Sequence, residues 1–325
     1  AFCPAARFVD LYLNSDYRGC YQISDQVQVH KGRVDIDEED GWLMEVANEN
    51  SREDPFITTT RYRITYNLKS PKDEHLTVSH RIAMGQWLQH FEEAVASNDF
   101  MDPGRGYRAY IDEQDFVNWY VGAEITGNID ALYSIYLYKD ADEDKMHFGP
   151  LWDMDLGYDN SSEKSLLRNM EAYLGLWNRP FEKIMQRLWQ DSWFAQACND
   201  RLNELVASGL EDYLLHHIDS LRTALWQSQT ENFKKWRINQ EVYSWAKHTY
   251  YSNYDSYVND LRSFVRTHIP YLQQAFAQRL TTGMEKVESG DRRLESEMYD
   301  LNGRRVETPT RKGIFIQHHH KTIQQ

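Results

Sequence analysis

Residues 124–155 decide the interpretation of this chain, and they read EITGNIDALYSIYLYKDADEDKMHFGPLWDMD. The stretch from Leu132 to Lys139 is rich in strand-forming residues, residues 140–145 make a polar turn, and residues 146–152 run back as a partner strand. The pattern predicts a β-hairpin whose turn is centred between Asp142 and Glu143.

The predicted hairpin gathers acidic residues at its open end. Pairing about this turn places Asp130 opposite Asp155 and Asp153 opposite Leu132, with Asn128 close by. Carboxylates that lie together repel one another unless a cation or a proton holds them. We therefore expect either a Mg²⁺ site that handles phosphates or an acid–base pair.

The flanking sequence predicts an α+β fold. Strand-forming runs occupy residues 7–13, 19–29, 41–46 and 61–68. Helical periodicity follows at 77–96 and at 113–126, where Asp112 is a suitable N-cap and Gly127 a suitable C-cap. Only helices are expected from residue 165, at approximately 165–174, 180–190, 192–208, 211–235 and 253–280. The order is a β-rich N-terminal lobe and a mostly helical lobe, with the site hairpin between them and a cleft at their junction.

Composition excludes several classes of function. The chain has 325 residues and a formal net charge of −14, whereas nucleic-acid binding requires a basic surface. The sequence has no apolar run of about 18 residues that would span a bilayer. Its three cysteines, Cys3, Cys20 and Cys198, are too few for a disulfide scaffold or a zinc site, although a Cys3–Cys20 bridge stays open.

Three features of the central stretch form a specific combination: the Asn128-Ile129-Asp130 motif, the strand at 136–139, and the segment FGPLWDMDL at 148–156. Matching segments also occur at 9–21, 41–45, 188–194 and 232–236. With them, the chain resembles the spore-coat protein H (CotH) kinase-like family over roughly residues 1–280. The two aspartates Asp130 and Asp153 lie 23 positions apart, and this paired motif is more specific than Trp-Asp-x-Asp alone.

The resemblance implies an atypical protein-kinase-like fold that transfers phosphate from ATP to Ser or Thr hydroxyls of a protein. On this basis Asp130 resembles the catalytic aspartate and Asp153 the metal-binding aspartate, as in ordinary protein kinases. We expect Asp155 as a second ligand of Mg²⁺ or Mn²⁺, and Asn128 and Glu124 as supporting residues. Glu124 lies four positions before Asn128, so a continuous helix would point it toward the hairpin mouth. The resemblance does not identify the residues that hold the nucleotide base.

The chain departs from the family pattern in two places. Asp25-Gln26 stands where the family usually has Glu-Gln, and the chain begins at Ala1, in the middle of the family's domain. The segment that the family has upstream includes a basic strand that helps to hold the nucleotide. We therefore expect a family member that lacks the N-terminal part of the domain, and the sequence leaves open whether this chain binds ATP and is catalytically active.

The C-terminal 283–325 region differs in character from the rest. Short strand-forming runs flank Asn302-Gly303, a strong hairpin signal. Residues 298–306 and 312–316 resemble the C-terminal tails of secreted Bacteroidetes-type proteins, which serve as sorting signals for export to the cell surface. We expect a CotH kinase-like domain at 1–282, β-rich to residue 70 and helical with the hairpin from 71, then a β-rich tail at 283–325, in an extracytoplasmic protein.

Two other functions stay open beside the extracytoplasmic kinase. One is a non-catalytic kinase-like surface module that binds a host protein or a polysaccharide through its aromatic residues. The other is a metal-dependent hydrolase in which two carboxylates activate water. Lys69 follows a predicted strand and is read as a surface lysine rather than a phosphate contact.

Overall fold

The computed structural model describes residues 3–47, 51–72, 74–133, 135–161, 181–237 and 251–288, together with short segments of the C-terminal region at 298–300, 305–306, 313–317 and 320–324. The chain divides into two compact units, residues 1–280 and 281–325. The first unit carries all of the predicted site residues.

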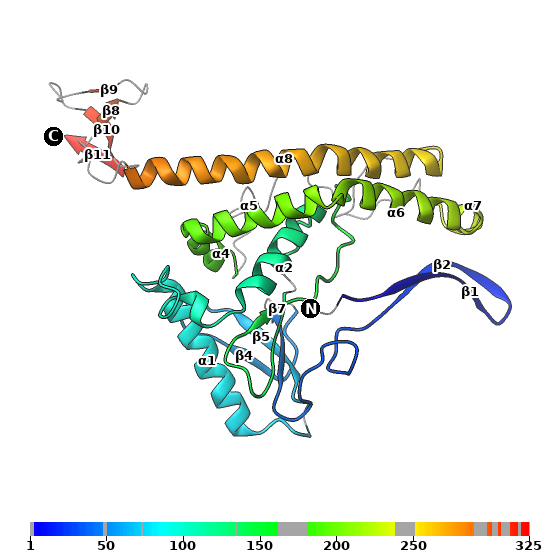
Figure 1. Cartoon of the computed structure of the whole chain (residues 1–325), viewed down its shortest axis with the longest axis horizontal. Helices are drawn as coiled ribbons and strands as arrows, with labels where there is room; N and C mark the ends of the chain where they lie inside the picture. Colours follow the sequence, from blue (N-terminus) through cyan, green and yellow to red (C-terminus); the bar gives the residue numbers. More distant parts are fainter. Residues whose placement is uncertain are drawn as a thin grey trace. The chain divides into compact units, whose positions relative to one another are not determined.

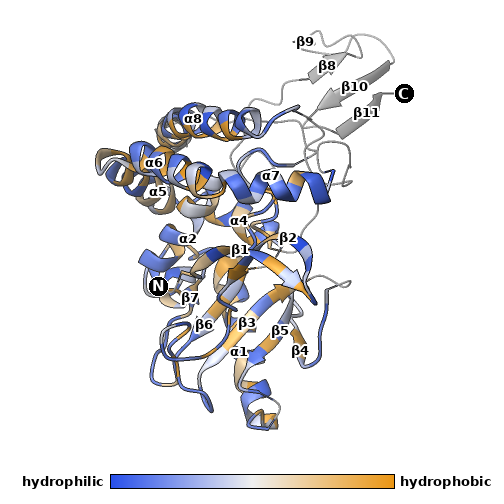
Figure 2. Cartoon of the chain, turned by 90° about the vertical axis from the view of Figure 1, so that its right-hand side faces the viewer, coloured by the Kyte–Doolittle hydropathy of each residue, from blue (hydrophilic) through white to orange (hydrophobic). Residues whose placement is uncertain are grey.

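The first unit is built on a five-stranded antiparallel sheet (Figure 1), whose order β4-β5-β3-β6-β7 can be followed by the labels in Figure 2. Its strands are β3 (Trp42–Ala47), β4 (Phe56–Thr58), β5 (Thr65–Ser70), β6 (Tyr136–Lys139) and β7 (His147–Phe148). The predicted hairpin is therefore present as β6–β7. It also pairs with the N-terminal strands through β3, so the hairpin extends the sheet of the β-rich lobe.

Alternation along the strands gives the sheet two different faces. Met44, Tyr66 and Leu137 belong to one face and pack into the main core with α1 (Val78–Ala96) and α2 (Glu113–Thr126). Leu43 and Tyr136 belong to the other face, which a smaller cluster from residues 27–36 covers.

Helix α2 forms where its capping residues predict. The Asp112 side chain accepts from the amide of Asp115, and Gly127 closes the helix in the left-handed region at φ 60°. Phe116 and Tyr120 of α2 are fully buried, and their rings pack edge-on against Phe148 and Phe194, respectively. The aromatic core therefore joins α2 both to the sheet and to the helices that follow.

Five further α-helices follow in the described part of the chain, and all but the last residues of α8, from Thr281, belong to the first unit. They are α4 (Glu182–Leu188), α5 (Ser192–Ala207), α6 (Leu210–Ala224), α7 (Trp226–Lys235) and α8 (Tyr254–Glu288). The predicted helix at 211–235 is divided at Leu225, whereas α8 continues through Pro270. The predicted helix at 165–174 lies outside the described residues. Phe264 and Ile269 of α8 pack against apolar residues of α6. The order of a β-rich region and then a helical region confirms the α+β, kinase-like prediction.

A separate two-stranded ribbon precedes the sheet. It consists of β1 (Ala6–Leu13) and β2 (Asp16–Ser24) and contacts α7, which is mostly hydrophilic and has no buried residue (Figure 2). The Trp236 ring nitrogen donates to the carbonyl of Arg18, and Asn232 accepts from the amide of Cys20. All three cysteines are free, so Cys3 and Cys20 do not form the disulfide that was left open.

The second unit contains a sheet of order β11-β10-β8-β9, from β8 (Met298–Asp300), β9 (Arg305–Val306), β10 (Gly313–Gln317) and β11 (His320–Gln324). The antiparallel pairing of β8 with β9 confirms the hairpin predicted from Asn302-Gly303. Strand β11 was not predicted.

The packing of α8 against the C-cap of α2 can be tested at Gly127. A Cβ atom there would lie 3.0 Å from Phe264 Cζ, in a backbone conformation that side chains disfavour. Gly127→Ala is expected to lower the free energy of unfolding by about 2–4 kcal/mol, measured by chemical denaturation. Gly209→Ala is the control, because Gly209 has φ 89° and no atom within 4 Å, and it should cost only about 1 kcal/mol. Equal losses would contradict the packing argument.

Candidate functional site

The loop after α2 holds the first part of the candidate site. Asn128 is 2% exposed, and its side-chain oxygen accepts from the amide of Asp130 at 3.1 Å. The side-chain nitrogen of Asn128, Nδ2, donates a hydrogen bond to the backbone carbonyl of Asp153 at 3.1 Å and lies 3.4 Å from Met154 Sδ. Asn128 therefore links the two loops that carry the predicted catalytic and metal-binding residues.

The second loop, 153–158, brings the carboxylates together. Partial burial, and then the charges of Asp155 and Asp130, raise the pKa of the Asp153 carboxyl. The backbone at Asp153 is left-handed, with φ 57°. The structure thus brings Asp130, Asp153 and Asp155 into electrostatic contact, as the hairpin pattern predicted.

The hairpin ladder does not produce this gathering in the expected way. The observed pairs Leu137–Phe148 and Tyr138–His147 follow the predicted register. However, the chain turns at 130–133, where the Tyr133 amide donates to the Asp130 carbonyl, so no strand places Leu132 opposite Asp153. The side chain of Asn128 makes the connection that the ladder was expected to make.

Glu124 lies in the interior of the helical layer. Its carboxylate accepts a hydrogen bond from the Tyr120 hydroxyl, which in turn accepts from the Trp189 ring nitrogen at 3.1 Å. The backbone carbonyl of Glu124 accepts from the Gly127 amide. Through Tyr120, Glu124 therefore links the end of α2 to Trp189, the residue directly after α4.

The sheet contributes a pair of charged residues, Glu45 and Lys69, that the sequence pattern does not place at the site. Glu45 of β3 lies opposite Tyr136 of β6, and Lys69 Nζ of β5 lies 3.0 Å from Glu45 and 2.6 Å from Glu53. Burial, and then the Glu45 charge, raise the pKa of Tyr136 to about 12. The same Glu45 charge adds to the raised pKa of Asp153, so this polar strip adjoins the acidic loop. The signal in the sequence is a single glutamate, Glu45, within the otherwise apolar strand β3.

Trp152 lies beside the polar residues Glu45 and Lys69, against Tyr136. Its ring packs edge-on against Tyr136, with centroids 6.1 Å apart, and it joins the smaller apolar cluster. The result is a polar surface of Glu45, Lys69 and Asp153 beside an aromatic pair.

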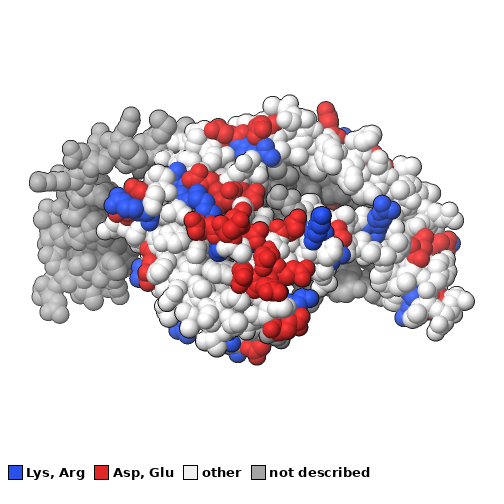
Figure 3. Space-filling model, turned by 60° about the horizontal axis from the view of Figure 1, so that its bottom comes forward, with Lys and Arg blue, Asp and Glu red and all other residues white. Residues whose placement is uncertain are grey.

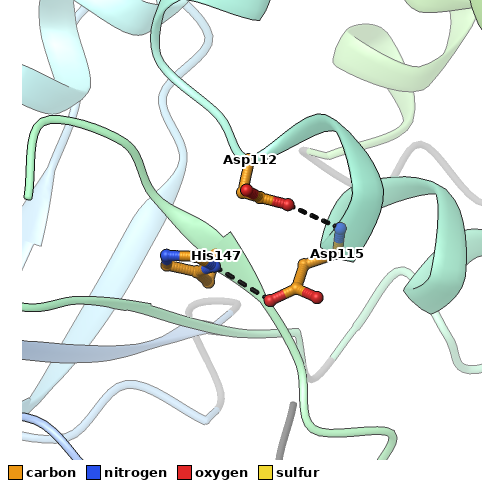
Figure 4. A group of neighbouring side chains, drawn as sticks. All are labelled: Asp112, Asp115 and His147. Atoms are coloured by element: carbon orange, nitrogen blue, oxygen red, sulfur yellow. Dashed lines mark hydrogen bonds and ion pairs between the residues drawn. The ribbon is translucent and has the colours of Figure 1, made fainter.

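A second titratable cluster lies at the other end of the hairpin. One ligand atom each from Asp112, Asp115 and His147 lies within 4.8 Å of the others, and Figure 4 shows the three side chains. Both ring nitrogens of His147 already have carboxylate partners: Nδ1 lies 2.9 Å from Asp115, and Nε2 lies 2.9 Å from Glu143. Asp112 accepts from the amide of Asp115. Two carboxylate partners favour the protonated imidazole, and the arrangement ties β7 to the start of α2.

This brace predicts a pH dependence of stability. The hydrogen bond to Asp115 raises the pKa of His147, so its stabilisation is present below about pH 6.5 and is lost as the pH rises through the raised value. The same contact lowers the pKa of Asp115, so its share is present above about pH 4 and is lost at lower pH. Asp115→Asn should therefore cost most between these limits, about 1–2 kcal/mol, and less above pH 8, in denaturation at a series of pH values.

Glu211→Gln is the matched control for this prediction. Glu211 is also acidic and lies in the first turn of α6, without a histidine partner in the described part of the chain. Its replacement should give a small effect that does not change between pH 6 and pH 8. A parallel pH profile for the two variants would refute the brace.

Acidic side chains also gather in a patch near the middle of one face of the molecule, as Figure 3 shows. Two acidic loops that are distant in sequence meet where the Asp37 amide donates to Asp140 at 2.8 Å. This surface repels a polyanion such as nucleic acid. No helix in the described part of the chain is long and apolar enough to cross a membrane.

The fold and the paired acidic loops define a kinase-like protein: an antiparallel sheet extended by a hairpin, followed by helices, with aspartates on the loops that flank the hairpin. Over residues 1–272 the chain matches the family model described as CotH kinase protein, and it belongs to this family. Comparison with curated proteins gave no match.

Membership of this family suggests the use of ATP and a divalent metal ion. The aspartates offer the right kind of donor, because hard cations take carboxylate and carbonyl oxygens, whereas among the described residues only Asp112, Asp115 and His147 bring three ligand atoms within 4.8 Å of one another. Three carboxylates lie close enough for Asp130 and Asp155 to raise the pKa of Asp153, a repulsion that a bound cation would remove.

Proposed function

We propose that this protein transfers phosphate from ATP to Ser or Thr hydroxyls of a protein substrate in a Mg²⁺-dependent reaction, at the cell surface or outside the cell. The observation that carries the proposal is the convergence of Asp130, Asp153 and Asp155 around the buried Asn128. The resemblance of the C-terminal tail to export signals supports the extracytoplasmic location.

Each residue has a role that its position supports. Asp153 and Asp155 would hold Mg²⁺, which when bound neutralises the charge of the phosphates. Asp130 would accept a hydrogen bond from the acceptor hydroxyl and orient it. Asn128 keeps the two aspartate loops at a constant separation. The Glu45–Lys69 pair fixes a lysine ammonium on the sheet face beside Asp153.

A second function has one observation in its favour. The β1–β2 ribbon carries Leu11, Tyr21 and Ile23 on one face, and these side chains are 41%, 44% and 62% exposed. An exposed apolar face of this kind is typical of an interaction surface. A non-catalytic kinase-like module that binds a host protein or a polysaccharide is therefore the alternative.

A binding and transfer experiment separates the two functions. ATP with Mg²⁺ is expected to raise the melting temperature of the wild-type protein, since a ligand that binds only the folded state stabilises it, and neither ATP alone nor Mg²⁺ alone should give the full shift. Labelled phosphate should then move from ATP to a Ser- and Thr-rich acceptor protein. Absence of both the Mg²⁺–ATP shift and transfer would leave the binding module as the better explanation.

A further inference from the structure

The C-terminal end of α2 receives an unusual donor. The last four carbonyls of a helix have no partner within the helix, so other groups must satisfy them. The Glu124 carbonyl accepts from Gly127 at 3.0 Å and also from the Nε2 atom of His268, at 2.6 Å. His268 belongs to α8 and lies 144 positions away in the sequence.

His268 is held tightly in the interior. It is 1% exposed and stacks on Phe264, with ring centroids 4.5 Å apart and planes 26° apart. A carbonyl only accepts, so Nε2 carries the proton. Nδ1 is buried and has no partner among the described residues, and burial lowers the pKa of the ring. Burying a ring nitrogen without a hydrogen-bond partner costs stability, so apolar packing alone would favour another side chain at this position.

Helix α8 touches both loops of the site through this corner. A Cβ built on Gly127 would lie 3.5 Å from His268 Nε2, so the ring lies directly against the residue that precedes Asn128. Phe264, one turn earlier, packs edge-on against Tyr158 with centroids 5.7 Å apart. The amide of Tyr158 donates to the carbonyl of Thr126 at 2.5 Å. The loop at 126–130 and the loop at 153–158 are therefore clamped together by one face of α8.

We infer that His268 is a positioning residue for the candidate site: its donor holds the end of α2, and through Gly127 and Asn128 it sets the separation of Asp130 from Asp153. The inference rests on the proposed phosphate transfer for its catalytic consequence. Its structural part, the restraint of the two loops, does not depend on that function.

Two substitutions at this position separate the donor from the packing. His268→Gln places an amide nitrogen near the position of Nε2, whereas His268→Leu keeps an apolar side chain and removes the donor. Hydrogen exchange of the amides at 127–130 and 153–158 should rise at least about tenfold in the leucine variant and stay near the wild-type rate in the glutamine variant. The kcat of phosphate transfer should fall at least about tenfold in the leucine variant, with KM for the acceptor little changed, and glutamine should restore most of it.

Leu272→Ala is the matched control, one turn further along α8. Leu272 is fully buried in the main core, so its removal costs stability without touching the Glu124 carbonyl donor. It should leave local exchange at 127–130 and kcat close to the wild-type values. If the leucine variant does not fold, His268→Asn, whose amide ends one methylene short, takes its place.

Two results would overturn the inference: wild-type exchange and kcat in the variant without the donor, or equal damage in the glutamine variant. If the wild-type protein transfers no phosphate, the proposed function fails. The exchange rates then still decide whether His268 restrains the two loops.

Discussion

Asp153→Asn is expected to reduce phosphate transfer at least about 1,000-fold, which corresponds to roughly 4 kcal/mol of transition-state stabilisation. The physical reason is the loss of the carboxylate that would hold Mg²⁺ against the phosphates. The stabilisation by ATP with Mg²⁺ in a thermal shift experiment should disappear in the same variant. Retention of both transfer and the Mg²⁺-dependent shift would exclude Asp153 as a metal ligand.

Asparagine is the appropriate replacement for Asp153 because the backbone there has φ 57°, a conformation that asparagine tolerates and alanine disfavours. The variant should also be at least as stable as the wild type at pH 7 without metal. A raised carboxyl pKa means that the folded protein binds the proton more tightly, so stability falls as the pH rises through that value. Removing the charge removes this loss.

Asp159→Asn is the control for the same loop. Asp159 directly follows the 153–158 loop and also has positive φ, at 61°. Its replacement should leave the Mg²⁺–ATP shift and the transfer rate near the wild-type values. Loss of activity in both variants would point to a general disturbance of the loop.

Asp130→Asn should have the second largest effect, a fall in kcat of roughly 100- to 10,000-fold. Asp130 would orient the acceptor hydroxyl and take its proton, and an amide cannot take it. The variant should fold normally, because the backbone amide of Asp130 still donates to Asn128. Its melting temperature should still rise with ATP and Mg²⁺, which distinguishes it from Asp153→Asn. Loss of that rise in melting temperature would indicate that Asp130 binds the metal ion rather than the acceptor hydroxyl.

Local rules account for the parts of the fold that the sequence predicted. The period-two pattern and the polar turn predicted the register of β6 with β7, and Asp112 and Gly127 predicted the two ends of α2. These features depend on residues that are close in the sequence, because the turn and capping residues themselves determine which backbone groups form hydrogen bonds. The convergence of Asp130, Asp153 and Asp155 followed from the same register argument, although the ladder stops before it reaches them.

Other parts of the site depend on contacts that no local pattern contains. Glu124 is predicted to point toward the hairpin mouth, but its carboxylate accepts a hydrogen bond from Tyr120, one turn earlier on α2, whose hydroxyl in turn accepts one from the distant Trp189. Lys69 is partly exposed, as expected of a surface lysine, but the sequence does not predict that it pairs with Glu45 on the sheet face beside the acidic loop. The orientation of each side chain depends on which strand or helix packs beside it. The contacts that fix it, Lys69–Glu45 and Tyr120–Trp189, join residues at least 24 positions apart in the sequence.

The sequence by itself determined the fold class, the hairpin, the capped helix and the family to which the chain belongs, because these follow from periodicity, turn residues and a specific pair of motifs. Only the tertiary structure decided how the two aspartate loops are joined, which polar residues of the sheet lie beside them, and that His268 of α8 supports the end of α2. These arrangements come from burial: once the core closes, each buried polar group must find a partner within reach, and the packed neighbours supply it.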